Sequence, residues 1–241
     1  RRAGQVTAAT LATVGAALRP GMTTGDIDRL VREDTAKRGG VPAQLGYRIP
    51  NAPPFPAAVC TSKHEVVCHG IPSDEVRLEP GDIVNVDCTT RVDGYHGDTS
   101  RTFVIGQPGP EARHLVAVTE RCLLAGIAEV RHGARIGDIG AAIQELAEAE
   151  GCSVVTDFGG HGIGKTMHGP PHVSHAGRRG LGPRLRAGMA ITIEPMLNLG
   201  GPEVTCLADG WTVVTRDGRL WAQVEPTLIV TKRCCEITSR A

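Results

Sequence analysis

The chain has 241 residues, enough to bury a sizeable core within one compact domain. Its 26 basic and 26 acidic residues give a formal net charge of zero, which argues against a nucleic-acid or membrane-surface binder. No apolar run approaches the roughly 20 residues of a membrane-spanning helix, and the N-terminal region lacks the apolar core of a signal peptide. We therefore expect a cytoplasmic protein. Its eight cysteines, without C-x-x-C spacing, are expected to be reduced thiols.

Helical periodicity opens the chain. Apolar spacing predicts a first helix over residues 6–18, which ends before a Pro-Gly pair. Thr23, followed three residues later by Asp26, is typical of a capping box at the start of a second helix. The segment 42–56 is rich in proline and glycine and predicts a surface loop.

Strands and helices then alternate in blocks. β-rich stretches lie at residues 57–61, 83–92 and 99–105. The pair Asp93-Gly94 predicts a turn between the last two, so we expect antiparallel pairing. Helical spacing returns at residues 115–122 and 139–146, and a second β-rich region fills the remainder.

Three short motifs occur twice in the same order. They are R-x-G-x-x-x-G-D-I at 19–27 and 131–139, H-G-I at 69–71 and 161–163, and L-x-x-G at 78–81 and 185–188. The last motif leads to Asp87 in one copy and to Glu194 in the other. We expect a single domain, residues 1–241, built from two related α+β halves of about 1–108 and 109–241. Packed around a pseudo-twofold axis, they would bring equivalent polar residues to one central site. The alternative is chance similarity of short glycine turns.

Acidic residues recur inside apolar strand patterns. Asp87 alternates with buried-type residues in the stretch 83–92, and Glu194 is expected to lie mid-strand in the second copy. A carboxylate within an apolar sheet costs several kcal/mol unless something pairs with it. A bound divalent cation is a strong candidate for that partner.

Three further residues strengthen this hypothesis. Asp98 begins the strand after the turn, Glu225 lies in a strand near the chain end, and His161 offers a nitrogen ligand. Carboxylates with one imidazole suit divalent metals, and the lack of paired cysteines argues against a closed structural zinc site. Each residue alone would be read as a solvated or salt-bridged group, but five together favour an open catalytic metal site.

Six short motifs together resemble those of one known family. They are VCHGIP (67–72), NVD (85–87), GDTS (97–100), GHGIG (160–164), TIEPM (192–196) and DGWTV (209–213). In this order, and almost from end to end, the chain resembles the type I methionine aminopeptidases. The resemblance implies the α+β pita-bread fold, with two pseudo-symmetric halves and a central curved antiparallel sheet covered by helices. It also implies removal of the initiator methionine from nascent polypeptides by a metal-activated water.

The resemblance also implies a site with two divalent ions, of Co, Mn, Fe or Zn. Asp87 would hold one ion through both oxygens, and Asp98 and Glu225 would bridge the pair. His161 and Glu194 would hold the second ion, with Glu194 as the general base.

Substrate contacts follow from the same resemblance. His69 and His168 correspond to two histidines that face the scissile amide and stabilise charge there. The candidates for a methionine side-chain pocket are Cys60, Phe55, Met167 and Trp211, although each could equally be core. His172 and His175 match nothing in the motifs and are expected to be loop residues. The ribosome is a candidate partner, and we expect a monomer.

The chain departs from the family pattern in two places. Glu225 is followed by Pro226-Thr227 rather than His-Thr, which removes a backbone donor beside a bridging ligand. Ser62-Lys63-His64 replaces Ser-x-Asn in a loop that helps to bind a monovalent cation in relatives, which puts that ion site in doubt.

Two other functions remain open. A proline-specific peptidase of the same fold would share the five ligands, but such enzymes usually carry an extra N-terminal domain, for which we expect no room here. A binding module that has lost its metals would explain Pro226, but the ligand set is intact.

Overall fold

The computed structural model describes residues 1–239, and within them the chain forms four helices and 14 strands. The helices are α1 (Arg2–Ala17), α2 (Thr24–Lys37), α3 (Pro110–Ala128) and α4 (Ile136–Ala149). The strands of the first part are β1 (Val41–Pro42), β2 (Cys60–Lys63), β3 (Val66–Cys68), β4 (Ile83–Val92) and β5 (Tyr95–Val104). Those that follow are β6 (Ser153–Val154), β7 (Gly160–Gly162), β8 (Gly169–Val173), β9 (Ala190–Thr192), β10 (Met196–Asn198), β11 (Val204–Cys206), β12 (Val213–Thr215), β13 (Trp221–Val230) and β14 (Cys235–Ile237).

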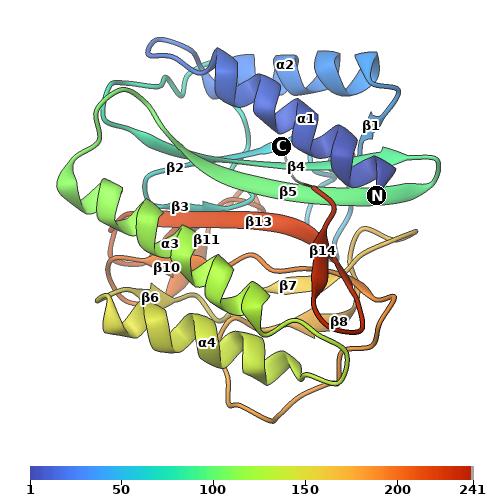
Figure 1. Ribbon diagram of the computed structural model, residues 1–241. Helices are drawn as coiled ribbons and strands as arrows, with labels where there is room; N and C mark the ends of the chain where they lie inside the picture. The colour runs from blue at the N-terminus through green and yellow to red at the C-terminus, as the bar shows by residue number, and fades with distance from the viewer. Residues whose placement is uncertain (240–241) are drawn as a thin grey trace.

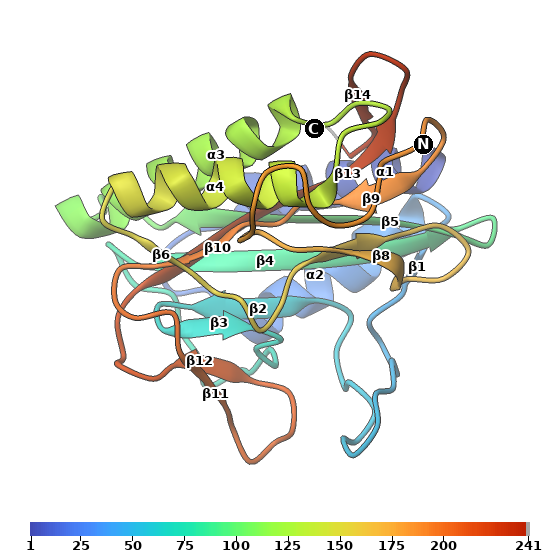
Figure 2. The same ribbon diagram turned by 90° about the horizontal axis from the view of Figure 1, so that it is seen from below.

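One antiparallel sheet organises the molecule. It has 11 strands among the described residues, and its main path runs β1-β4-β5-β13-β9-β7-β8. β13 lies at the centre of this path, beside β5 from the first part of the chain (Figure 1). A smaller sheet, β11-β12-β3, lies on the side away from α3 and α4 (Figure 2).

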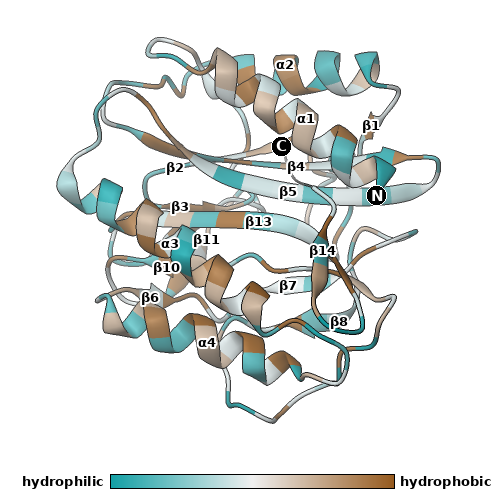
Figure 3. Cartoon of the chain, in the orientation of Figure 1, coloured by the Kyte–Doolittle hydropathy of each residue, from teal (hydrophilic) through white to brown (hydrophobic). Residues whose placement is uncertain are grey.

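The helices cover the sheet in two pairs (Figure 1). α1 packs on β4 and β5, while α3 packs on β13 and against α4. Each pair buries its own apolar cluster, one containing Ile27 and Val31 of α2 and the other Leu115 of α3 and Ile139 of α4. The apolar stripes of α3 and α4 are visible as brown bands separated by teal residues (Figure 3). Most of the charged residues of both helices lie on their outer faces, as expected for helices covering a sheet, although Leu124 of α3 is exposed there.

The local turn and cap predictions are confirmed. Thr23 Oγ1 accepts the N–H of Asp26 (3.1 Å), and the Asp26 carboxylate accepts the N–H of Thr23 (2.8 Å), so the capping box is complete. Asp93 and Gly94 have φ angles of 50° and 80°, as a type I′ hairpin turn requires. β5 therefore begins at Tyr95, earlier than the predicted stretch.

Two boundary predictions were wrong. The expected strand at 57–61 begins only at Cys60, where pairing with Asp87 of β4 starts. Glu194 does not lie mid-strand, because β9 ends at Thr192. Pro195 follows Glu194 and has no N–H for a ladder hydrogen bond, so strand pairing is interrupted there and resumes only in β10.

Candidate metal centre and active site

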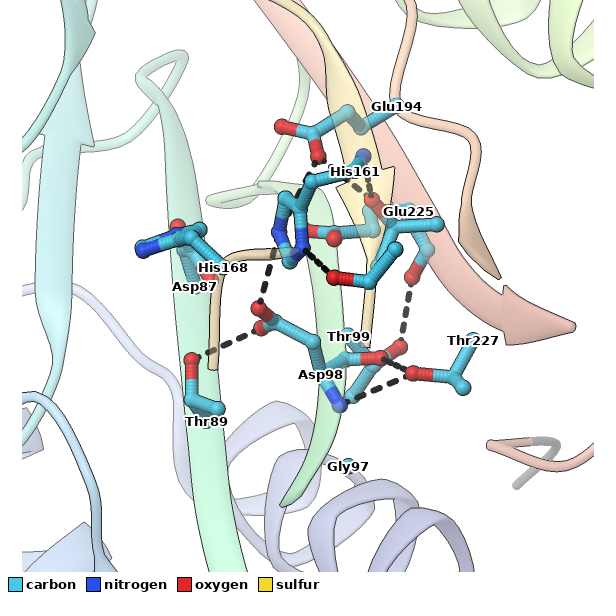
Figure 4. A network of polar contacts seen from close by, with 12 residues as sticks. Asp87, Thr89, Gly97, Asp98, Thr99, His161, His168, Glu194, Glu225 and Thr227 are labelled. Atoms are coloured by element: carbon cyan, nitrogen blue, oxygen red, sulfur yellow. Dashed lines mark hydrogen bonds and ion pairs between the residues drawn. The ribbon is translucent and has the colours of Figure 1, made fainter. Parts of the chain in front are cut away.

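Five neighbouring parts of the sheet each contribute one polar side chain to the same place. The positions are Asp87 in β4, Asp98 in β5, Glu225 in β13, Glu194 just after β9, and His161 in β7. Because these strands are consecutive in the sheet, side chains on one face converge (Figure 4). All five are the residues expected to hold metal.

The five fall into two overlapping groups. Ligand atoms of Asp87, Asp98 and Glu225 lie within 4.8 Å of one another, and so do those of His161, Glu194 and Glu225. The two groups are close, since His161 Nε2 lies 3.6 Å from Asp98 Oδ2 and 3.8 Å from Glu194 Oε1. Glu225 belongs to both groups, which is the arrangement that a bridging ligand requires.

The electrostatics of the cluster call for a cation. Burial, followed by the charges of Asp98 and Glu194, raises the pKa values of Asp87 and Glu225 well above their usual range. Burial also raises the pKa of Glu194 to about 7, although His161 opposes the shift. Burial alone would lower the pKa of His161, but the neighbouring carboxylates outweigh it and raise it to about 9. Four carboxyl groups thus surround a single imidazole, which cannot balance the charge of all four.

Two oxygen atoms in the cluster lack protein partners. Asp87 Oδ1 and Glu225 Oε1 are buried and accept no hydrogen bond from the described residues. An unpaired carboxylate oxygen is costly to bury. Oxygen donors with one imidazole nitrogen are ligands that Mn²⁺, Fe²⁺, Co²⁺ and Zn²⁺ accept, so the residues fit divalent metal ions.

Other oxygens of the predicted ligands are fixed by hydrogen bonds. Thr89 Oγ1 donates to Asp98 Oδ1 over 2.9 Å (Figure 4). Glu194 receives two such bonds, from Thr192 Oγ1 to Oε1 (2.8 Å) and from Gln223 Nε2 to Oε2 (3.0 Å). Such outer partners orient ligands and tune their affinity for metal.

His175 is a contributor that sequence reasoning missed. It lies in the loop after β8, as expected, but it is 1% exposed, and its Nε2 accepts the backbone N–H of Glu194 over 3.0 Å. Burial lowers the pKa of His175 to about 3, which keeps the ring neutral and Nε2 free to accept. His172, also expected in a loop, lies in β8 and lines the cavity beside the cluster.

The two predicted substrate histidines both line the cavity. His69 has a φ of 54°, a left-handed conformation that is uncommon outside glycine and aims this ring beside Phe158 and Trp211. The ring of His168 lies 4.4 Å from that of His161, and its Nδ1 is 2.7 Å from the hydroxyl of Tyr47. Burial lowers the pKa of each histidine to about 4, so both are neutral near pH 7.

The cavity has a volume of about 350 Å³ and an apolar wall. All four predicted pocket residues line it, namely Cys60, Phe55, Met167 and Trp211. Phe55 and Trp211 meet edge to face with centroids 5.2 Å apart, and Trp211 Nε1 donates to Pro53 O in the proline-rich loop. Gln44, Tyr47 and Ile49 of the same loop region also line the cavity, although no motif marked them.

The structure accommodates both departures from the family pattern. Pro226 pairs with Thr99 of β5, and Thr99 Oγ1 donates to Glu225 O over 2.6 Å, so the predicted bridging residue is anchored despite the missing donor. Lys63 and His64 both bind the carboxylate of Asp82, each over 2.7 Å.

Comparison with known proteins decides the family. The model of Metallopeptidase family M24 matches residues 1–232. The chain belongs to this family. As an M24 metallopeptidase it is a divalent-metal-dependent hydrolase, which agrees with the cluster of carboxylates and imidazole.

Individual members refine the placement within M24. Methionine aminopeptidase B of Synechocystis is 51% identical over 241 residues, covering 100% of this chain and 88% of that protein. The crystal structure of methionine aminopeptidase from Rickettsia prowazekii superimposes with a TM-score of 0.94 at 43% identity, covering 98% of this chain and 94% of that one. The predicted α+β pita-bread fold and the resemblance to type I methionine aminopeptidases are thereby confirmed.

A structure of a proline-specific peptidase is also similar. Prolidase from Pyrococcus furiosus matches with a TM-score of 0.76 at 17% identity, and the chain covers 62% of it. This likeness shows the fold alone. Within residues 1–239, none of the helices combines the length and apolarity needed to cross a membrane.

Proposed function

We propose that this M24 metallopeptidase removes the N-terminal methionine from nascent polypeptides by hydrolysis. The observation that carries the proposal is the five-residue ligand cluster at the base of a small apolar cavity, in a chain that matches methionine aminopeptidases over its full length. The cavity volume suits one side chain of moderate size. The proposal includes a monomeric enzyme that acts in the cytoplasm, with the ribosome as a candidate partner.

The ligand set suits two ions. Asp87 would hold one ion, Asp98 and Glu225 would contact both, and His161 and Glu194 would hold the other. Two divalent ions there, of Mn, Fe, Co or Zn, supply Lewis acidity and lower the pKa of water toward neutrality.

The protein's own groups would move the protons. Glu194 is fixed by Thr192 and Gln223, so its carboxylate is positioned to take a proton from the attacking water and return it to the departing amine. His69 and His168 are neutral near pH 7, and an N–H of each can donate to the scissile amide as negative charge develops. Tyr47 can hold His168 in one tautomer by donating to Nδ1.

The apolar wall would select methionine. Cys60, Phe55 and Trp211 form one side of the cavity, and Met167 precedes His168 on another. Sulfur–aromatic contacts favour a thioether beside Phe and Trp rings. A pocket of this kind discriminates by about 1–3 kcal/mol per methylene, so shorter and branched side chains should be cleaved more slowly.

A peptide assay tests the proposal. Metal-reconstituted protein should release methionine from Met-Ala-Ser, Glu194→Ala should lower kcat by at least about a hundredfold, and Ala-Ala-Ser should be spared. Release from an Ala-Pro peptide but not from Met-Ala-Ser would replace the proposal with a proline-specific peptidase. A protein that binds no metal would be a binding module instead.

A further inference from the structure

The side chain of Gln44 fills a gap along the outer edge of β4. β1 pairs with β4 at Thr90 and Arg91, and β2 pairs with it at residues 84–87. Between these two strands, Gln44 Nε2 donates to Asp87 O over 2.8 Å, and Gln44 Oε1 accepts the N–H of Thr89 over 3.0 Å. The carboxamide thus makes the donor and acceptor contacts that the backbone of a continuous partner strand would make.

Both bonds lead directly to predicted metal ligands. Asp87 is itself a ligand, and Thr89 donates its hydroxyl to Asp98 Oδ1 over 2.9 Å (Figure 4). One side chain therefore fixes the backbone on either side of Cys88, and through it the placement of two of the carboxylates. Gln44 is 7% exposed, so water does not compete freely for either bond.

Gln44 lies beside the active-site cavity rather than within an apolar core cluster. It lines the active-site cavity, with Nε2 3.7 Å from Cys60 Sγ. Three residues further along the same loop, Tyr47 contacts His168. The first residues of the loop between β1 and β2 thus contact the backbone of a predicted metal ligand through Gln44 and a predicted substrate histidine through Tyr47.

We propose that Gln44 is a positioning residue of the metal centre, which sets the spacing of the carboxylates of Asp87 and Asp98 through the backbone of β4. This inference rests on the proposed function only in treating those carboxylates as metal ligands. It concerns metal affinity, and it stands independently of which peptide is cleaved.

The test is a metal-binding measurement on Gln44→Met, which keeps the length of the side chain and removes both hydrogen bonds. Calorimetric titration of metal-free protein with Mn²⁺ alone should show affinity for at least one ion about ten- to a hundredfold weaker than wild type. The absorption spectrum of the Co²⁺-loaded variant should also change. Gln44→Asn, which retains a carboxamide but is too short to span both partners, should weaken Mn²⁺ binding less.

A matched control separates positioning from general destabilisation. Asn198 is another buried carboxamide, and its Nδ2 donates to Gly201 O over 2.8 Å outside the lining of the cavity. Asn198→Leu should lower the melting temperature but leave Mn²⁺ affinity and the Co²⁺ spectrum unchanged. Wild-type Mn²⁺ affinity in folded Gln44→Met, or equal weakening in Asn198→Leu, would overturn the proposal. Failure to cleave Met-Ala-Ser would bear on the proposed function and not on this result.

Discussion

At the scale of single residues, the backbone N–H of Glu194 shows that the position of a predicted ligand depends on groups that are not themselves ligands. β9 ends two residues earlier, so no strand accepts this N–H, and His175 does so instead. His175→Ala should leave a buried donor unpaired and lower the free energy of unfolding by about 1–3 kcal/mol. Urea denaturation of the metal-free protein measures this.

The neighbouring His172 provides the control for that prediction. Its side chain is exposed in β8, so His172→Ala should change the free energy of unfolding by less than about 0.5 kcal/mol. Equal effects of the two substitutions would contradict the role given to His175.

Asp82 provides a prediction that depends on pH. Burial alone would raise the pKa of its carboxyl, but hydrogen bonds from Lys63, from the N–H of Glu79 and from His64 outweigh burial and lower the pKa below 3.8. A carboxyl with a lowered folded-state pKa stabilises the protein above the unfolded-state pKa, and this contribution is lost as pH falls through the folded-state value. Asp82→Asn should therefore destabilise the protein by about 1–3 kcal/mol at pH 7.

The difference between wild type and Asp82→Asn should stay nearly constant down to about pH 5 and shrink below about pH 4. Urea unfolding at a series of pH values tests this. Asp93→Asn serves as the control, since Asp93 pairs with Arg2 at the surface and should matter little at any pH. A difference in the free energy of unfolding that grows on acidification would contradict the lowered pKa of Asp82.

The sequence revealed some functional residues and not others for a physical reason. Asp87 and His161 are predicted to act through their own side chains, so their residue types and spacing within the motifs identify them. Gln44 and His175 act on backbone atoms that are 43 and 19 residues away in the chain. A bond to a backbone atom places no constraint on the partner's residue type, so no side-chain pattern marks such a pair.

At the scale of elements, the contact of α1 with β5 depends on Gly97. A Cβ at this position would overlap the backbone of Ala3 and Gly4, and Thr7 Oγ1 donates to Gly97 O over 3.0 Å. Gly97→Ala should therefore push α1 away from the strand that carries Asp98. We expect a loss of about 3 kcal/mol in the free energy of unfolding, at the upper end for overpacking because backbone cannot move aside as a side chain can.

Chemical denaturation of Gly97→Ala and Gly164→Ala makes the comparison. A Cβ on Gly164 would meet no atom within 4 Å, so that variant should be within about 0.5 kcal/mol of wild type. A Gly97→Ala protein as stable as Gly164→Ala would show that α1 adjusts freely.

Periodicity and turn chemistry predicted the four helices and the long hairpin, but not the individual strands of the second β-rich region or the points where strands are interrupted. Helices and the hairpin of β4 and β5 follow from local signals, such as Thr23 and the Asp93-Gly94 pair. The break after Thr192 does not, because it depends on which strand lies opposite. The proline-rich loop was expected at the surface, yet Phe55 is only 2% exposed and packs on Trp211 from the distant DGWTV motif.

At the scale of the whole molecule, the internal repeat has matching contacts in its two copies. Gly21 N–H donates to Leu78 O over 2.8 Å, and Gly133 N–H donates to Leu185 O over 2.9 Å. Both glycines have nearly the same positive φ, 88° and 89°. The division into halves at about residue 108 stays a prediction, and these contacts support it because they join the same motifs in each copy.

The predicted metal ligands come from four strands and from the segment just after β9, and they meet only in the folded chain, so metal binding would be a property of the folded state. The unfolded chain separates the ligands, so ions should stabilise the folded state by mass action, by about 2.7 kcal/mol at a hundred times the dissociation constant. For a domain of this size that corresponds to a rise of about 5–10 °C in melting temperature. Scanning calorimetry with added Mn²⁺ and with a chelator measures it.

A variant with fewer charges tests the cause of this stabilisation. In the metal-free protein, burial makes the ionised forms of Asp87 and Glu225 costly, the charges of neighbouring carboxylates add to this cost, and the pKa values of both groups rise. Asp87→Asn combined with Glu225→Gln should therefore melt at least as high as the metal-free wild type, while losing most of the rise on addition of Mn²⁺. A variant that kept the full rise would mean that Mn²⁺ stabilises the protein at another place. If the variant instead melted far below the metal-free wild type, the two carboxylates would have a structural role. The stabilisation by Mn²⁺ would then not come from relieving the cost of these buried charges.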